Sequence, residues 1–173
     1  MEAAVGSGAP EVVRAFSESF LGSLVHDVNL VHGLLEGMAE SVPAEVIGGD
    51  WWNEGRAVYG ALRLESGARV DAAWIQLLDT FEYRETIQFM FADEVHVLEF
   101  PSPWLKQHPT IYRRSRRNGR AADIKLVRAY REAFSRELEH FHDCITLGVA
   151  CRTPPEQARL DVDVLTQMFR AAR

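Results

Sequence analysis

One histidine lies in a local sequence that could support acid–base chemistry. His26 is followed by Asp27 and Asn29, and it comes after the irregular segment 20–23 at the predicted start of a helix. The helix dipole disfavours the charged form of a histidine at a helix N-terminus, so such a side chain can exchange a proton near neutral pH. We therefore predict His26 as the acid or base, with Asp27 and Asn29 as substrate contacts. The alternative is a structural histidine that caps the helix or packs in the core.

The other residues that could carry chemistry form no recognised metal or nucleotide motif. His140 and His142 are two residues apart on a predicted helix, so they point to nearly opposite sides and make a poor metal pair. Cys144 and Cys151 form no C-x-x-C pair, and no second pair completes a zinc site. The only G-x-G, at positions 6–8, lacks the third glycine of a dinucleotide fingerprint and the strand that should precede it. We predict no metal site and no cofactor bound by this chain alone.

Composition narrows the class of protein. The 173 residues are 47% hydrophobic and 25% charged, as in an ordinary globular domain, and the net charge of -6 gives no reason to bind nucleic acid or an anionic membrane. The basic run 113–117 is interpreted as a charged edge strand, with an anion site as the alternative. No signal peptide or membrane-spanning run is recognised, so a cytoplasmic protein with two free thiols is expected.

The elements that must position these residues follow an order of helices, strands and helices. Helices are predicted over 11–21 and 26–38, strands over 57–64, 69–78, 81–91, 94–100 and 110–116, the last as an edge strand. A further helix is predicted from the apolar stripe between Val127 and Ile145, ending at Gly148. The last helix is predicted to start at a capping box over 153–156, with Asp161 and Asp163 facing outward.

This order predicts an α+β fold with a mostly antiparallel, open-faced sheet and helices packed on one face. Residues 1–20 are expected to be a linker remnant, and residues 21–173 a single domain. The sheet carries too many aromatic side chains for one face, so the second face is predicted to be an oligomer interface or a substrate floor. Candidate substrate-binding residues on the sheet, whose alternative role is ordinary packing, are Trp51, Trp52, Trp74, Tyr83, Arg84 and Glu85.

Segment 24–35, LVHDVNLVHGLL, resembles the "HD-hydrophobic-(D/N)-L" signature of Gfo/Idh/MocA-type oxidoreductases. The tail also resembles that family's closing helices, through YREAF at 130–134, ELEHFHDCI at 137–145, Gly148 and DVDVL at 161–165. The resemblance extends over 21–173 and implies the C-terminal, substrate-side domain of the family. Members place an NAD(P)-binding Rossmann domain before it, and that domain also supplies a catalytic lysine. In many members an aspartate stands four residues before the histidine, where this chain has Gly22.

Three functions are consistent with these observations. The first is a substrate-side domain that works with a separate Rossmann-domain partner, which would supply NAD(P). The second is a cofactor-independent isomerase, lyase or cyclase that uses His26 on a carbonyl-containing small molecule. The third is a non-catalytic binding module that forms a homodimer through its sheet face. In the first two the chain binds a small molecule, and by resemblance alone that molecule would be a sugar or a polyol.

Overall fold

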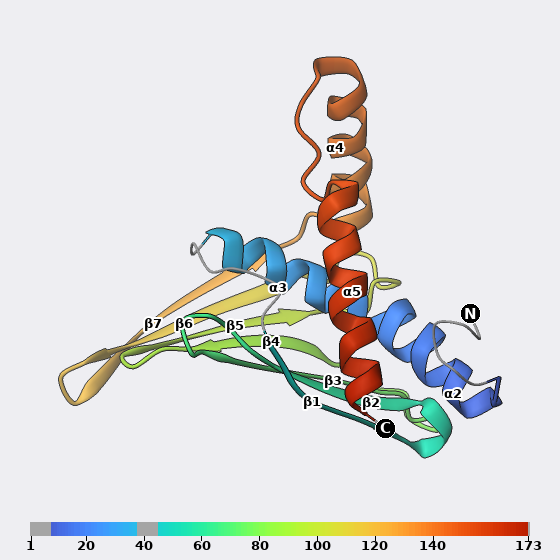
Figure 1. Cartoon of the computed structure of the whole chain (residues 1–173). Helices are drawn as coiled ribbons and strands as arrows, with labels where there is room; N and C mark the ends of the chain where they lie inside the picture. Colours follow the sequence, from blue (N-terminus) through green and yellow to red (C-terminus); the bar gives the residue numbers. More distant parts are fainter. Residues whose placement is uncertain (1–7, 38–44, 173) are drawn as a thin grey trace. The chain divides into compact units, whose positions relative to one another are not determined.

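The computed structural model describes residues 8–37 and 45–172, which form the predicted α+β fold (Figure 1). Contacts divide the chain into two compact units. The first unit comprises the chain up to Asp79 together with the segment from Arg152 onward, and the second is Thr80–Cys151. Each unit contains one sheet. From the sequence we expected a single sheet, whereas the structure has two, one with three strands and one with four.

The first sheet is a meander of three antiparallel strands. They are β1 (Glu45–Trp52), β2 (Ala57–Arg63) and β3 (Arg69–Ile75), in the order β1-β2-β3, with the short 3₁₀ turn η2 (Asn53–Gly55) between the first two. The predicted hairpin of β2 and β3 is confirmed. The sequence analysis did not assign β1, because an irregularity in its pairing between Val46 and Gly48 interrupts the two-residue alternation.

The N-terminal helices run on without the predicted break. α2 (Pro10–Arg14) continues into the π-helical segment η1 (Ala15–Leu24) and then into α3 (Val25–Gly37). Across the expected break, the Val25 amide donates to the Phe20 carbonyl, five residues earlier, so hydrogen bonding continues. The prediction that His26 lies at a helix N-terminus was therefore wrong. Met38, at the end of the predicted helix, lies outside the described residues.

From the sequence we expected residues 1–20 to be a linker remnant. In the structure, residues 10–20 are helical and contribute to the core of the first unit. Phe16 and Phe20 are buried, and both rings contact Phe169, with centroids 5.1 Å and 6.0 Å away. Aromatic pairs of this kind bury large apolar areas, so they hold η1 against the C-terminal helix. The same cluster contains Val58 and Leu62 of the first sheet, so η1 helps to exclude water from these two side chains.

The C-terminal helix α5 (Pro155–Ala171) lies directly on β1 and β2 (Figure 1). Gly49 and Gly60 are paired across these strands, and both face α5. A Cβ on Gly49 would lie 2.3 Å from the Met168 carbonyl oxygen, and one on Gly60 would lie 2.4 Å from the Met168 Sδ. Both distances are shorter than any tolerable contact, so only glycine allows the helix to approach this closely.

The predicted capping box of α5 does not form. Pro154 occupies the N-cap position, Pro155 begins the helix, and no side chain caps it. Proline suits the first helical turn because the missing N–H would have no partner there. The Thr153 hydroxyl instead donates to the Asn29 side-chain oxygen at 3.3 Å, which ties the start of α5 to α3.

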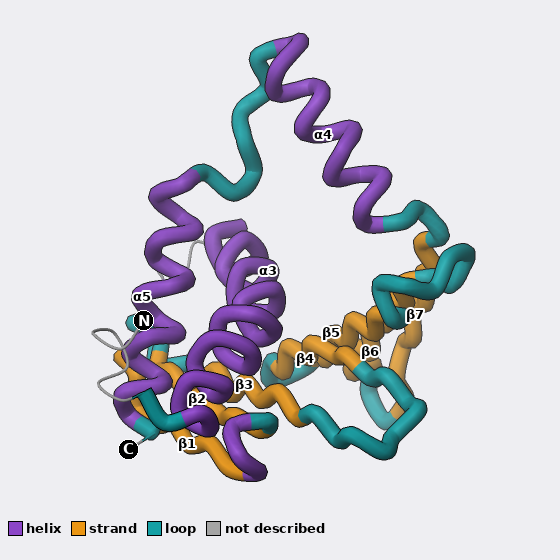
Figure 2. The backbone as a smooth tube through the Cα atoms, turned by 90° about the vertical axis from the view of Figure 1, so that its right-hand side faces the viewer, coloured by secondary structure: helices purple, strands orange, loops and turns teal. Residues whose placement is uncertain are grey.

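The second unit contains the second sheet, whose strands follow one another as hairpins (Figure 2). Its strands are β4 (Glu85–Met90), β5 (Glu94–Phe100), β6 (Thr110–Asn118) and β7 (Ala121–Ala129), in the order β4-β5-β6-β7. The prediction that β6 is the last edge strand was wrong, because β7 pairs with it along its whole length.

Helix α4 (Ala133–Leu147) follows β7 and starts later than predicted. Val127 matches the helical spacing of the stripe, but it pairs with Tyr112 in the sheet. The end of the helix is confirmed, since Gly148 adopts the left-handed conformation (φ 67°) that terminates it. No residue of α4 is buried.

Candidate functional site

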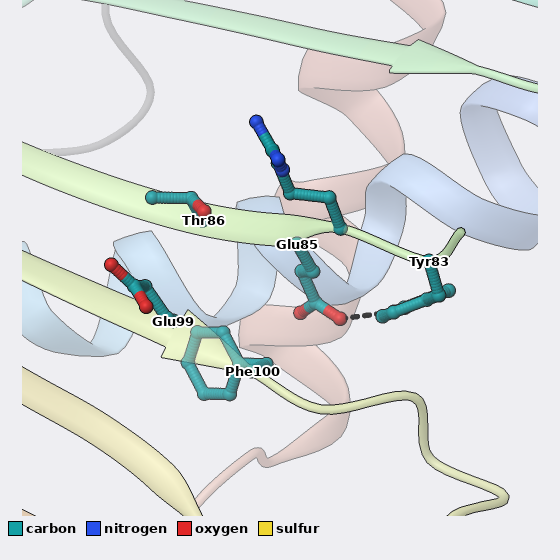
Figure 3. Close-up of a pocket in the computed structure, with 6 residues that line it drawn as sticks. Tyr83, Glu85, Thr86, Glu99 and Phe100 are labelled. Atoms are coloured by element: carbon teal, nitrogen blue, oxygen red, sulfur yellow. Dashed lines mark hydrogen bonds between the residues drawn. The ribbon is translucent and has the colours of Figure 1, made fainter.

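A pocket of about 460 Å³ opens at one end of the second sheet (Figure 3). This volume falls in the range of small-molecule sites. The pocket lies wholly within the second unit, and its lining combines two carboxylates, two hydroxyls, a guanidinium and two aromatic rings. The lining residues are Tyr83, Arg84, Glu85, Thr86, Glu99 and Phe100.

Strand pairing positions these side chains. Glu85 lies opposite Phe100, and Thr86 lies opposite Glu99. Successive residues of a strand point to opposite faces, so each pair lies on its own face of the sheet. Glu85 begins β4 and Phe100 ends β5, so the pocket forms at the strand ends, where the chain from Tyr83 enters the sheet.

The polar groups of the pocket are partly paired with one another. The Tyr83 hydroxyl donates a hydrogen bond to the Glu85 carboxylate, and Figure 3 shows the two side chains directed at each other. The Arg84 guanidinium donates to Glu82 at 3.0 Å, which offsets its charge. Glu85 and Glu99 lie on opposite faces of the sheet, and each carboxylate disfavours a phosphate or carboxylate ligand placed beside it. The carboxylates and hydroxyls can bond the hydroxyls of a neutral ligand, while the ring of Phe100 packs against its carbon atoms.

The structure brings together three of the predicted substrate-binding residues, namely Tyr83, Arg84 and Glu85. The three tryptophans belong to the first unit and do not share one site there. Trp51 and Trp74 both flank Val58 and pack against the core, whereas Trp52 follows Trp51 on the strand and faces the other way. Core packing explains Trp51 and Trp74 without any ligand.

His26, the predicted acid or base, lies exposed in the first turn of α3. Within the described part of the chain, its imidazole has no hydrogen-bond or ion-pair partner that would orient it. Asp27 is half-buried beside it. A catalytic role for His26 remains a prediction. The dipole at a helix N-terminus no longer supports it, and what supports the role is that the imidazole is accessible to a ligand.

The buried histidine of α3 is His32, which lies two turns after His26. Its Nδ1 lies 2.7 Å from Asp161 Oδ1, and the two side chains are only 3% and 1% exposed. The Asn29 side-chain amide donates to Asp161 Oδ2 at 2.6 Å, and His32 Nε2 lies 3.5 Å from Glu36. The expectation that Asp161 faces outward was therefore wrong, and Asn29 contacts Asp161 rather than an open site. We refer to Asn29, His32 and Asp161 as the α3–α5 polar network.

This network is structural in its geometry. Both oxygens of the Asp161 carboxylate accept a hydrogen bond from α3, so the charge is compensated where water is excluded. The network therefore joins α3 to α5, and a role for Asn29 in substrate binding stays a prediction.

Sequence reasoning missed Thr86, Glu99 and Phe100 as lining residues. Their strands were predicted, so the residue types were visible, but which residues face each other depends on the register of β4 against β5. The α3–α5 polar network was missed because its two ends lie 129 residues apart. The alternation of polar and apolar residues carries no signal for either relation.

Two further searches of the described residues gave negative results. No group of three histidine, cysteine, aspartate or glutamate side chains is arranged to hold a metal ion in residues 8–37 and 45–172. Over the same residues, none of the helices combines the length and the apolar character that crossing a bilayer requires.

Comparison with known proteins relates the chain to a solved structure. No protein-family model matches the sequence, and no curated protein matches it. The chain superposes on KijD10, a 3-ketoreductase from Actinomadura kijaniata solved with NADP and TDP-benzene, with a TM-score of 0.64 and 14% identity. The match covers 92% of this chain and 48% of KijD10, so this chain spans about half of that protein's length. It therefore shares the fold of part of an NADP-bound reductase.

Proposed function

We propose that this chain is the substrate-side domain of a Gfo/Idh/MocA-type oxidoreductase that works with a separate cofactor-binding protein. The observation that carries the proposal is the polar pocket at the start of β4, which would hold the substrate. The fold likeness to part of KijD10 supports it, because that protein was solved with NADP, whereas the sequence of this chain contains no dinucleotide fingerprint.

The substrate we propose is a small, neutral, polyhydroxylated molecule. The Glu85 and Glu99 carboxylates are hydrogen-bond acceptors, and the hydroxyls of Tyr83 and Thr86 can both donate and accept. An anionic ligand beside the Tyr83–Glu85 pair would be repelled by the Glu85 carboxylate, since Arg84 is already paired with Glu82. The pocket is open to solvent, so we expect weak binding until a partner protein covers it.

Ligand binding tests the pocket. We expect saturation-transfer NMR to detect contact with myo-inositol and D-glucose, and a markedly weaker signal for glucose 6-phosphate. Glu85→Gln removes the charge that accepts the Tyr83 hydroxyl and should weaken binding about tenfold. The matched control is Glu18→Gln, because Glu18 is an exposed glutamate on η1 in the other unit. Equal signals for the neutral and the phosphorylated sugar, or equal loss in both variants, would contradict the proposal.

A second measurement tests the cofactor partner. NADP-agarose should not retain the purified chain, whereas it should retain the chain from an extract that contains its partner protein. Retention of the purified chain alone would overturn the division of labour that we propose. If NADP-agarose retained the chain neither alone nor from the extract, the proposal of a cofactor-binding partner would be wrong.

A cofactor-independent isomerase, lyase or cyclase is the second candidate, and one observation favours it. The Tyr83 hydroxyl and the Glu85 carboxylate form a hydrogen-bonded pair in the pocket, and such a pair can move a proton without a cofactor. In this case Tyr83→Phe and Glu85→Gln should abolish exchange of solvent deuterium into a carbonyl compound such as dihydroxyacetone. If His26→Ala abolished the exchange and the two pocket variants did not, the acid–base role would belong to His26, as the sequence predicted.

A further inference from the structure

Helix α4 presents a row of large apolar side chains to solvent. Phe134, Leu138, Phe141 and Ile145 are 51%, 68%, 63% and 68% exposed. They recur on one side of the helix, which is labelled α4 in Figure 2 and belongs to the second unit. An exposed apolar surface of this kind marks an interaction site. We call these four residues the α4 seam.

The spacing of the α4 seam is that of a coiled coil. The intervals between its residues are four, three and four, which places Phe134 and Phe141 at d positions and Leu138 and Ile145 at a positions. A helix that packs on a globular core has a broader apolar face, in which further positions beside a and d are also apolar. Here the flanking e and g positions are polar or small, so the α4 seam fits a second helix of similar kind.

The flanking residues favour a parallel second copy of α4. Glu137 lies at a g position and His142 at the following e position, five residues later. In a parallel pair of helices this g position faces the e position of the other chain, so Glu137 meets His142 of the partner subunit on both sides. An antiparallel pair would instead place Ser135 near the partner's His142, so the Glu137 carboxylate would not face that imidazole.

We propose that α4 pairs with α4 of a second copy as a short parallel coiled coil, independently of the proposed function. The contact is small. Covering the four seam residues removes about 450 Å² per chain, roughly half of what a stable interface buries on each partner. We therefore expect a reversible dimer with a dissociation constant on the order of tens of micromolar. This contact is separate from the sheet-face interface expected from the sequence, which stays a prediction.

Sedimentation equilibrium on the full chain tests the proposal. The wild type should pass from monomer to dimer between about 1 and 200 µM. Leu138→Glu and Ile145→Glu should each leave a monomer over this range, because they put a charge into the seam. Both side chains are exposed in one copy, so the fold should survive, and circular dichroism checks this. The control is Arg136→Glu, which changes a charge on the opposite side of α4 and should leave the dimer intact.

Charge exchange tests the parallel orientation without altering the seam. Glu137→Lys and His142→Glu should each weaken the dimer about threefold to tenfold, and the double variant should restore it. Failure of the double variant to restore dimerisation would overturn the parallel arrangement. A wild-type chain that stays monomeric at the highest concentration, as expected if a different protein covers the seam, would overturn the proposal altogether.

Discussion

The helices α5 and α4 are both amphipathic, yet only α5 buries its apolar side within its own unit. Val164, Leu165, Met168 and Phe169 of α5 are completely covered by the first sheet and by η1. The seam of α4 is exposed along its length. An amphipathic pattern therefore states that a helix needs a partner, whereas the complementary surface decides whether that partner lies in the same chain.

The surface that receives α5 in the first unit, made by the sheet and by α3, has two features that the described residues of the second unit do not offer to α4. One is the close approach of backbone at Gly49 and Gly60, which brings α5 against the strands. The other is the α3–α5 polar network, which compensates a buried charge at a defined point of the helix. Both features fix one orientation of α5, and both can be removed by single substitutions.

The largest effect is expected at the polar network. Asp161→Ala leaves His32 and Asn29 buried without their acceptor, and it should lower the free energy of unfolding by about 3–5 kcal/mol. Asp163→Ala, two residues further along, removes an exposed side chain and should change stability by less than about 0.5 kcal/mol. Urea unfolding followed by tryptophan fluorescence measures both. Equal stability of the two variants would mean that the network does not hold α5.

The same substitution in the two helices compares them directly. Leu165→Ala opens a cavity in the core and should cost about 2–5 kcal/mol. Leu138→Ala removes an exposed side chain and should cost less than about 1 kcal/mol when measured near 1 µM, where the chain is monomeric. A similar loss in both variants would show that α4 packs within its own chain, which would remove the contrast between the helices.

Two adjacent glycines sharpen the explanation for the position of α5. Gly49→Ala forces a Cβ against the Met168 carbonyl and should cost about 1–3 kcal/mol. Gly48→Ala meets nothing within 4 Å and should leave stability unchanged or raise it slightly. Thermal unfolding separates the two outcomes. Tolerance of alanine at both positions would mean that α5 does not require the close approach.

The smallest effect concerns a polar cluster on the other face of the first sheet. The Arg69 guanidinium, with help from the Tyr59 hydroxyl, lowers the pKa of Asp71 below its ordinary value of 3.8. The stabilisation is therefore present above pH 3.8 and is lost as the pH falls through the lowered pKa. The melting temperature of the wild type should exceed that of Asp71→Asn at neutral pH, and the difference should shrink toward about pH 2. Since the cluster is exposed, the difference should also fall in high salt.

Local patterns in the sequence predicted much of the fold. The β2–β3 hairpin, β5, the end of α4 at Gly148 and the α+β class are confirmed, because each depends on residues close together in the chain. The end of β7, from Val127, was interpreted as helix because Val127 and Phe134 lie on one helical spacing. The pairing that makes Val127 part of a strand comes from β6, and local periodicity does not report it.

The candidate site was less predictable for the same reason. Tyr83, Arg84 and Glu85 could be named because they are neighbours, but Glu99 and Phe100 join them only through strand pairing. His32 and Asp161 are ordinary surface residue types until each is seen to compensate the other. His26 was favoured over His32 because a helix start was expected there, and a continuous helix replaced it.

The π-helical segment η1 sets the phase of everything before it. Its apolar residues Phe16, Phe20 and Leu24 are spaced four apart, so they lie on one side of the helix, toward the core. Shortening the chain by one residue here would tighten the helix and rotate α2 about its axis by roughly 100°, the angle between successive residues. The length of η1 therefore fixes the rotation of α2 relative to the core, and a change of one residue would turn a different side of α2 toward it.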